Sequence, residues 1–251
     1  MNNEITMSVN ENLTLIQNKN GLTFGTDAYL LAAFTQGGSK KTCADLGSGT
    51  GIIPLLCASK NKFQKIYAVE IQQSFADLIS RNAEANGLDG KIETVCTDVR
   101  SLSANMLGGE VDCVMSNPPY MKVDSGKRNE HDEKFIARHE VCGDIGDFCA
   151  AAAKILKFGG SFYVVWRPDR ICDLMDALRR NKLEPKLMTF IHATSQSQPS
   201  MVLIRAKKGA ASGCTLTRPL FLHDNAEDAR KNKLSRDAET IYATCSFESF
   251  T

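Results

Sequence analysis

The sequence lacks the features that would assign the protein to a membrane, a secretory route or a structural metal site. No apolar run approaches the roughly 18 residues that a membrane-spanning helix needs. The opening stretch, MNNEITMSVNENLTLIQ, is polar and contains no apolar core of a signal peptide. Nine cysteines occur without a C-x-x-C pair, and the four histidines do not cluster with them at metal-ligand spacing. We therefore expect a cytoplasmic protein with reduced thiols, no membrane contact and no metal.

The sequence also lacks an excess of charge of either sign. It contains 30 lysines and arginines against 29 aspartates and glutamates, which gives a net charge of +1. This balance argues against a generally basic nucleic-acid coat but leaves room for a local basic face. With 251 residues, of which 43% are hydrophobic, the chain suits one domain of ordinary α/β size.

From residue 42 onward, apolar strand-like segments alternate with helix-like segments. The strand-like segments are TCADLGS (42–48), KIYAVEI (65–71), KIETVCTD (91–98), VDCVMSN (111–117), SFYVVWRP (161–168), KLMTFIHA (186–193) and PSMVLIRAKK (199–208). Such alternation predicts a mainly parallel sheet with helices on both faces. The last two segments are close enough in sequence to pair as antiparallel neighbours. We therefore expect an α/β fold with seven strands, one of them antiparallel.

The stretches before and after this region are harder to interpret. In residues 1–25 we expect a hairpin whose strands are LTLIQ and LTFG, followed by the helix TDAYLLAAFT, which Thr26 or Asp27 can cap. A helix is also expected over 143–160, ending at a glycine pair. We expect a single domain, 1–251, made of an N-terminal segment (1–41), a core (42–208) and a C-terminal extension (209–251) that has no readable function.

The first predicted strand runs into the glycine-rich turn Asp45-Leu46-Gly47-Ser48-Gly49-Thr50-Gly51. Glycines let the backbone turn tightly and approach a ligand closely. The dinucleotide pattern G-x-G-x-x-G fails because Ile52 stands at its last position. A G-x-G-x-G turn after an acidic residue instead fits a nucleoside cofactor without a pyrophosphate. The alternative is a tight strand-to-helix turn that binds nothing.

Acidic residues follow the next two predicted strands, at the sheet edge where such folds bind ligands. Glu70 can accept hydrogen bonds from both hydroxyls of a ribose, and the alternative is an exposed glutamate at a strand end. After the third strand, Asp98 can accept a hydrogen bond from an adenine amino group while Val99 packs on the ring. The alternative for Asp98 is a helix cap. Together these strand ends indicate an adenosine-like cofactor.

The fourth predicted strand ends in Asn117-Pro118-Pro119-Tyr120. Proline cannot donate a ladder hydrogen bond, so the strand must stop here. The Asn117 side-chain oxygen and the Pro118 carbonyl can both accept hydrogen bonds from one planar amino group, on whose ring Tyr120 can stack. The prolines make this tip rigid, which favours precise positioning. The alternative is a plain turn.

These motifs resemble a known family. DLGSGTGI, AVEI, TD and NPPY, in this order and spacing, resemble the class I S-adenosylmethionine-dependent methyltransferases that modify amino groups. The resemblance covers about residues 21 to 208 and implies a Rossmann-like fold. GLTFGTDAYLLAAF and IARHE are similar to the bacterial family that methylates N6 of an anticodon-loop adenine in valine tRNA.

The resemblance implies roles for particular residues. Asn117, Pro118, Pro119 and Tyr120 are expected to hold the target amino group of an unstacked base. Independently of the resemblance, Lys122, Lys127 and Arg128 just past this motif are candidate contacts to the RNA backbone, as are Arg230, Lys231 and Lys233 in the extension. The alternative for each is a solvated surface charge. The residues expected to contact S-adenosylmethionine are Thr26, Asp27, Asp45, Gly47, Gly49, Thr50, Gly51, Glu70, Ile71, Asp98, Val99 and Asn117.

The resemblance leaves three rivals to a tRNA adenine-N6 methyltransferase. Within enzymes these are an rRNA guanine-N2 methyltransferase and a protein glutamine-N5 methyltransferase. The glutamine enzymes that modify release factors carry a helical domain before the glycine turn, and only 44 residues precede Asp45 here. The third rival is a non-catalytic module that binds S-adenosylmethionine and RNA, against which the intact motif at 117–120 counts. We expect a monomer or a weak homodimer.

Overall fold

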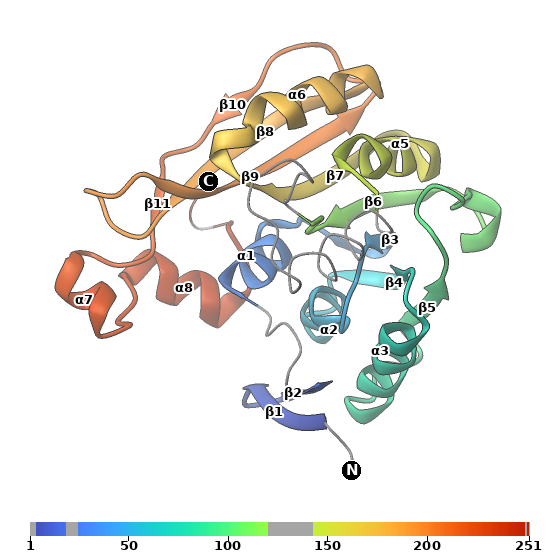
Figure 1. Cartoon of the computed structure of the whole chain (residues 1–251), viewed down its shortest axis with the longest axis horizontal. Coiled ribbons are helices and arrows are strands. Elements are labelled where there is room, and N and C mark those ends of the chain that lie inside the picture. The colour runs from blue at the N-terminus through green and yellow to red at the C-terminus, as the bar shows by residue number, and fades with distance from the viewer. Residues whose placement is uncertain (1–3, 19–24, 120–142, 249, 251) are drawn as a thin grey trace, which may run out of the picture.

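A nine-stranded sheet forms the centre of the computed structural model, which describes residues 4–18, 25–119, 143–248 and 250 (Figure 1). Seven core strands lie in the order β8-β9-β7-β6-β3-β4-β5, and only β9 among them runs antiparallel to its neighbours. The predicted mainly parallel sheet with one antiparallel strand is thereby confirmed. Two short strands of the C-terminal extension, β10 and β11, pair with β8. The strands are β3 (Gly38–Leu46), β4 (Phe63–Glu70), β5 (Ile92–Cys96), β6 (Val111–Ser116), β7 (Leu156–Trp166), β8 (Leu183–His192), β9 (Pro199–Lys208), β10 (Thr215–Leu216) and β11 (Leu220–Phe221).

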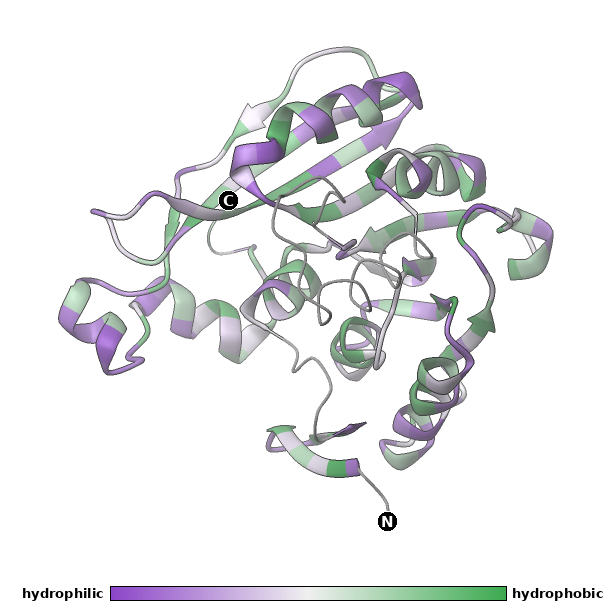
Figure 2. Cartoon of the chain, in the orientation of Figure 1, coloured by the Kyte–Doolittle hydropathy of each residue, from purple (hydrophilic) through white to green (hydrophobic). Residues whose placement is uncertain are grey.

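Helices cover both faces of the sheet, as the alternating pattern predicts. One hydrophobic cluster joins α1, α2, α3 and α8 to the sheet, and a second joins α5 and α6 to the other face. Central strands are buried on both sides, so they are mainly hydrophobic in Figure 2, whereas α7 is mostly hydrophilic. The helices are α1 (Thr26–Phe34), α2 (Ile52–Ser59), α3 (Gln73–Ala85), α5 (Ile145–Ile155), α6 (Ile171–Arg180), α7 (Ala226–Arg230) and α8 (Arg236–Thr244), with short 3-10 turns η1 (Ala104–Leu107) and η2 (Pro168–Arg170).

The N-terminal hairpin is formed by a different pair of strands from the pair predicted. LTLIQ lies in β2 (Leu13–Asn18), but it pairs with the preceding strand β1 (Glu4–Asn10), and LTFG lies partly outside the described residues. The missed signal is the alternation of Ile5, Met7 and Val9, since Met7 and Val9 pack against the core. The Asn10 side chain accepts a hydrogen bond from the Asn12 backbone N–H at 2.9 Å and forms the turn.

Two further boundaries differ from the prediction. Helix α5 ends at Ile155, four residues before the glycine pair, because β7 already begins at Leu156 and pairs with Val111 of β6. Helix α1 has Gly25 at its N-cap position with no side-chain cap, so Thr26 and Asp27 lie in its first turn. All residues of α1 from Ala28 to Phe34 are buried.

The hairpin is fastened to α3 by two asparagines. Asn82 Oδ1 accepts from the backbone N–H of Ile16 at 2.7 Å, and its Nδ2 donates to the Ile16 carbonyl at 3.0 Å. One turn later, Asn86 makes the same pair of bonds with Thr14, at 2.9 and 2.8 Å. Four residues of helix rise about 6 Å and two residues of strand about 6.8 Å, so the side-chain amides match the strand repeat. The two asparagines thus replace a neighbouring strand.

The C-terminal extension is fastened to α1 by aromatic rings. Tyr29 of α1 stacks on Tyr242 of α8 with ring centroids 4.5 Å apart, and its hydroxyl donates to the Tyr242 carbonyl at 2.7 Å. Farther along α1, Phe34 meets Phe247 edge to face at 5.5 Å. The extension therefore packs on the helix that carries Asp27.

Candidate active site and cofactor pocket

The strand register brings the predicted site residues to one edge of the sheet. Leu46 pairs with Val69 of β4 and with Ser116 of β6, so the glycine turn, Glu70 and Asn117 emerge side by side. Glu70 in turn pairs with Cys96 at the end of β5. The carboxyl ends of parallel strands form the ligand edge of such sheets. Four strand ends that lie far apart in the sequence therefore meet here.

The glycine turn has the backbone shape that its sequence predicts. Gly47, Gly49 and Gly51 have φ angles of 75°, 56° and 82°, a left-handed region that favours glycine. A Cβ atom at Gly47 or Gly51 would also press on Phe148 or Ile79, at 3.3 and 3.2 Å. At Gly49 a Cβ would meet nothing within 4 Å. The turn thus presents bare backbone at Gly49, where a ligand can approach it closely.

Glu70 holds this turn in place. Its Oε2 accepts from the backbone N–H of Gly49 and its Oε1 from that of Gln72, both at 2.9 Å. Burial raises the pKa of Glu70, and the backbone N–H groups of Gln72, Gly49 and half-buried Ile71 oppose that rise. Each carboxylate oxygen has a second lone pair that can accept a ribose hydroxyl. The role toward ribose stays a prediction.

Asp45 lies beneath the turn with its carboxylate sealed from solvent. Both carboxylate oxygens are buried without a hydrogen-bond partner among the described residues. Burial raises the pKa of Asp45 to about 7. The nearby Ser48 side chain lowers this pKa, and the negative charge of Glu70 raises it. A buried carboxylate is costly unless it meets a cation or a donor. The negative charge of Asp45 beneath the turn therefore favours a cationic ligand at this edge, and Glu70 beside it can accept ribose hydroxyls, a combination that suits S-adenosylmethionine.

Asp98 and Val99 follow β5 at the same edge. Asp98 accepts hydrogen bonds from the backbone N–H and from the guanidinium of Arg100, at 2.8 and 2.9 Å, and this pairing lowers its pKa. Asp98 therefore stabilises a tight turn. This role is closer to the helix-cap alternative than to the predicted contact with adenine. Val99 is 7% exposed and belongs to the hydrophobic cluster under α5. Contact of either residue with adenine stays a prediction.

Asn117 is held by a residue 90 positions earlier in the chain. Its Nδ2 donates to Asp27 Oδ2 at 2.9 Å, and Asp27 Oδ1 accepts from the Ala28 backbone N–H at 2.9 Å. Just before Asn117, Ser116 Oγ donates to the Leu46 carbonyl at 2.8 Å, which ties the tip to the glycine turn. The sequence suggested both Asp27 and Asn117, but no local pattern indicated that they touch.

Helix α1 is held firmly at its C-terminal end as well. Lys62 Nζ donates to the carbonyls of Ala32, Ala33 and Thr35, at 2.6, 3.3 and 2.9 Å. A cation at this end satisfies unpaired carbonyls and complements the helix dipole. Nothing in the sequence around Lys62 pointed to this role.

A second polar link reaches the glycine turn from the hairpin side. Asn82, which grips β2, also donates from Nδ2 to the Thr50 carbonyl at 3.0 Å. Asn82 is fully buried, so all its polar atoms depend on these partners. Thr50 is thereby fixed through its backbone. Asn82 was not among the predicted site residues.

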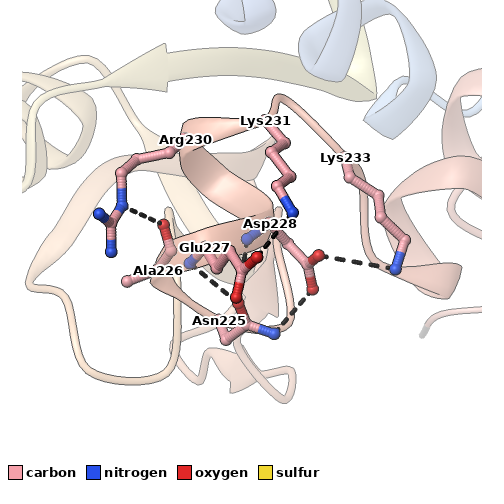
Figure 3. A network of polar contacts seen from close by, with 7 residues as sticks. All are labelled: Asn225, Ala226, Glu227, Asp228, Arg230, Lys231 and Lys233. Atoms are coloured by element: carbon pink, nitrogen blue, oxygen red, sulfur yellow. Dashed lines mark hydrogen bonds and ion pairs between the residues drawn. The ribbon is translucent and has the colours of Figure 1, made fainter.

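Several predicted residues lie outside this described site. Tyr120, Lys122, Lys127 and Arg128, and the stretch IARHE, fall outside the described residues. Pro118 is buried and Pro119 half-buried at the tip. In the extension, Lys231 pairs with Glu227 and Lys233 with Asp228, at 2.6 and 3.6 Å, and Arg230 Nε donates to the Ala226 carbonyl (Figure 3). The two lysines are thus offset by nearby acids of α7.

Comparison with known proteins matches this geometry to a family. The profile of the methyltransferase small domain matches residues 16–181, which include the glycine turn, Glu70, Asp98 and Asn117. The chain belongs to the methyltransferase small domain family. This methyltransferase is 30% identical over 198 residues to a Phocaeicola vulgatus protein named tRNA1(Val) (adenine(37)-N6)-methyltransferase, with 77% of this chain and 80% of the relative covered. A protein of the same name from Porphyromonas gingivalis is 26% identical over 207 residues, covering 79% and 80%.

Solved structures support the same fold. A predicted O-methyltransferase from Agrobacterium tumefaciens superposes with a TM-score of 0.65 at 21% identity, covering 84% of this chain and 98% of the other. The protein is therefore an S-adenosylmethionine-dependent methyltransferase with a class I, Rossmann-like fold. No described helix is long and apolar enough to cross a membrane. Within the same part of the chain, no three His, Cys, Asp or Glu side chains are grouped to hold a metal ion.

Proposed function

We propose that this methyltransferase acts on the exocyclic amino group of adenine in RNA, at N6 of an anticodon-loop adenine in tRNA. The observation that carries the proposal is the position of the Asn117 tip, which lies beside the glycine turn and is held by Asp27. In the proposal, the Asn117 amide oxygen and the Pro118 carbonyl are the acceptors. The two relatives described above are named for N6 methylation of adenine 37 in a valine tRNA. An anticodon loop is single-stranded, so its bases can be unstacked at a cost of about a few kcal/mol or less.

The pocket residues divide the work of holding the cofactor. Glu70 accepts the ribose hydroxyls, buried Asp45 acts on the positively charged methionine part through its charge from beneath the turn, and Gly49 allows close approach of the backbone. Asp98 and Val99 flank the adenine, and Thr26 and Asp27 close the site from the N-terminal segment 1–41. When bound, S-adenosylmethionine supplies an electrophilic methyl group on a positively charged sulfur. The core 42–208 carries the remaining contacts.

The target amino group is activated by acceptors and not by a strong base. Asn117 Oδ1 and the Pro118 carbonyl each accept a hydrogen bond from one N–H of the target amino group. These two hydrogen bonds draw electron density onto the nitrogen. Methylation makes the nitrogen acidic, so its surplus proton passes to water after transfer. Tyr120 stacks on the base, and Lys122, Lys127 and Arg128 contact the RNA backbone.

The proposal is tested by methyl transfer from labelled S-adenosylmethionine to unmodified bulk tRNA, with nucleoside analysis of the product. Label in N6-methyladenosine is the expected result, and Asn117→Ala should abolish most of it while calorimetry shows cofactor affinity within about threefold of wild type. Parallel reactions offer rRNA and protein as acceptors, and label in N2-methylguanosine or in glutamine would replace the proposed acceptor. Cofactor binding without transfer to any of these acceptors would point to a non-catalytic binding module.

A further inference from the structure

The hydrogen bond between Asn117 and Asp27 has a consequence for the orientation of the amide. An ionised carboxylate can only accept hydrogen bonds, so Asn117 must turn its NH₂ group toward Asp27. The amide oxygen Oδ1 then points away from Asp27. The opposite orientation would place two oxygens against each other and present N–H donors where an acceptor is required. Asp27 therefore selects one of the two orientations of a nearly symmetric side chain.

The position of Asp27 is itself fixed by several contacts. Its second oxygen accepts the Ala28 backbone N–H, which locks the carboxylate to the start of α1. Helix α1 is buried, its C-terminal carbonyls bind Lys62, and Tyr29 stacks on Tyr242 of α8. A carboxylate on such a rigid element can impose an orientation on its partner with little loss of its own freedom.

We propose that Asp27 is a positioning residue that keeps the Asn117 oxygen aimed at the amino group of the target base. This inference rests on the proposed function, because it assigns Asn117 Oδ1 the role of acceptor. It assigns Asp27 an action through Asn117 in addition to the predicted closure over the cofactor. The N-terminal segment then contributes to the reaction step itself.

A reciprocal exchange of the two side chains tests the proposal. Asp27→Asn leaves the amide orientation unspecified and should lower kcat about 10- to 100-fold, with KM for tRNA within about threefold of wild type. Asn117→Asp places two carboxylates in contact and should lower kcat at least as much. In the double variant D27N/N117D, the new amide at position 27 donates to the new carboxylate at position 117, whose other oxygen accepts the target amine. The kcat of this variant should recover to within about tenfold of wild type.

A control separates this role from a helix-end effect. Asp237 also lies in the first turn of a helix, α8, and pairs with Arg218 at the surface. Asp237→Asn should leave kcat unchanged, and a thermal melt checks that all variants fold. If D27N/N117D is no more active than the better of the two single variants, or if Asp27→Asn keeps wild-type kcat, the positioning role is wrong.

A readout without turnover distinguishes this inference from the proposed function. In ¹⁵N-asparagine-labelled protein, the Asn117 side-chain NH₂ signals, assigned by their loss in Asn117→Ala, should include one downfield proton bonded to a carboxylate. That shift should disappear in Asp27→Asn and persist in Asp237→Asn. Unchanged Asn117 signals in Asp27→Asn would overturn the inference even in an active enzyme. A wild-type protein that shows the shift but methylates no RNA would instead overturn the proposed function alone.

Discussion

The N-terminal hairpin and the C-terminal helix α8 are attached to the same face of the sheet by different physical means. Besides its apolar contacts with the core, the hairpin is held by side-chain amides of Asn82 and Asn86, which copy the hydrogen bonds of a strand. Helix α8 is held by aromatic stacking between Tyr29 and Tyr242 and by neighbouring apolar contacts. Hydrogen bonds are directional, whereas apolar packing depends mainly on area and fit.

The two attachments also lead to different halves of the site. Through Asn82, the hairpin reaches the Thr50 carbonyl in the glycine turn, which is the cofactor side in our proposal. Through α1, the C-terminal helix reaches Asp27 and so the Asn117 amide, which is the target side in our proposal. Damage to the first should therefore weaken cofactor binding, and damage to the second should slow the reaction. The comparison thus predicts that the two segments outside the core act on separate steps.

The largest effect is expected from Asn82→Leu. It leaves the Ile16 N–H and the carbonyls of Ile16 and Thr50 without partners, which should lower the free energy of unfolding by about 3 kcal/mol. Cofactor affinity should fall about tenfold, since the glycine turn loses a support. Urea denaturation and calorimetry measure the two quantities. Asn86→Ala is the control, because it disturbs the hairpin without touching Thr50. Equal losses of affinity in both variants would show that the Thr50 link does not matter.

The next effect in size is expected in the pH dependence of the unfolding free energy, which should come from Asp45 and not from the α8 attachment. Asp45, beneath the glycine turn, has its pKa raised to about 7, so its charge changes within the range from pH 5 to 8. Tyr29, which stacks on Tyr242 of α8, has its pKa raised to about 12 and keeps its proton over that range. Between about pH 4 and 7 the unfolded chain loses the Asp45 proton while the folded chain keeps it, so stability falls as pH rises. From pH 5 to 8 the wild type should lose about 2 to 3 kcal/mol more than Asp45→Asn. Parallel pH curves of denaturation for the two proteins would contradict the buried state of Asp45.

A smaller and different effect is expected from Tyr242→Ala. Removing the stacked ring should cost about 2 kcal/mol of unfolding free energy. It should lower kcat severalfold while cofactor affinity stays within about threefold, because α1 loosens and the glycine turn does not. Tyr242→Phe is the matched control, because it keeps the stacked ring and removes only the hydroxyl. A loss of cofactor affinity that exceeds the loss of kcat would show that α8 acts on the cofactor side.

The parts of the site that the sequence predicts are those encoded locally. Gly47, Gly49 and Gly51 reveal their backbone shape by residue type, and Pro118 marks the end of β6 because proline has no N–H to donate to a neighbouring strand. Because parallel strands share one carboxyl edge, the alternation of strands and helices also predicts that these turns meet. The seven core strands with one antiparallel member, and the position of Glu70 at a strand end, followed from the same reasoning and from the family resemblance.

The contacts that the sequence does not predict join residues far apart in the chain. Asn82 and Asn117 bond to partners 66 and 90 positions away, and asparagine alone is as common in loops and caps as in buried networks. One signal was available: Asn82 and Asn86, four apart in the sequence of a predicted helix, are poor helix formers on one face. The strand pairing of the hairpin was predicted wrongly, because the sequence NKNG is more typical of a turn than the sequence around Asn10, where the turn forms.

The smallest effect is expected where the hairpin meets α3 through charge. Glu4 and Arg81 form a two-bond ion pair at 2.9 and 2.7 Å, and this pairing lowers the pKa of Glu4. The pair is exposed, so water and salt screen it. Glu4→Gln should leave cofactor affinity and kcat unchanged and should shift the urea midpoint far less than Asn82→Leu. A shift that matches Asn82→Leu and vanishes in high salt would instead mean that surface charge, and not the buried amides, holds the hairpin.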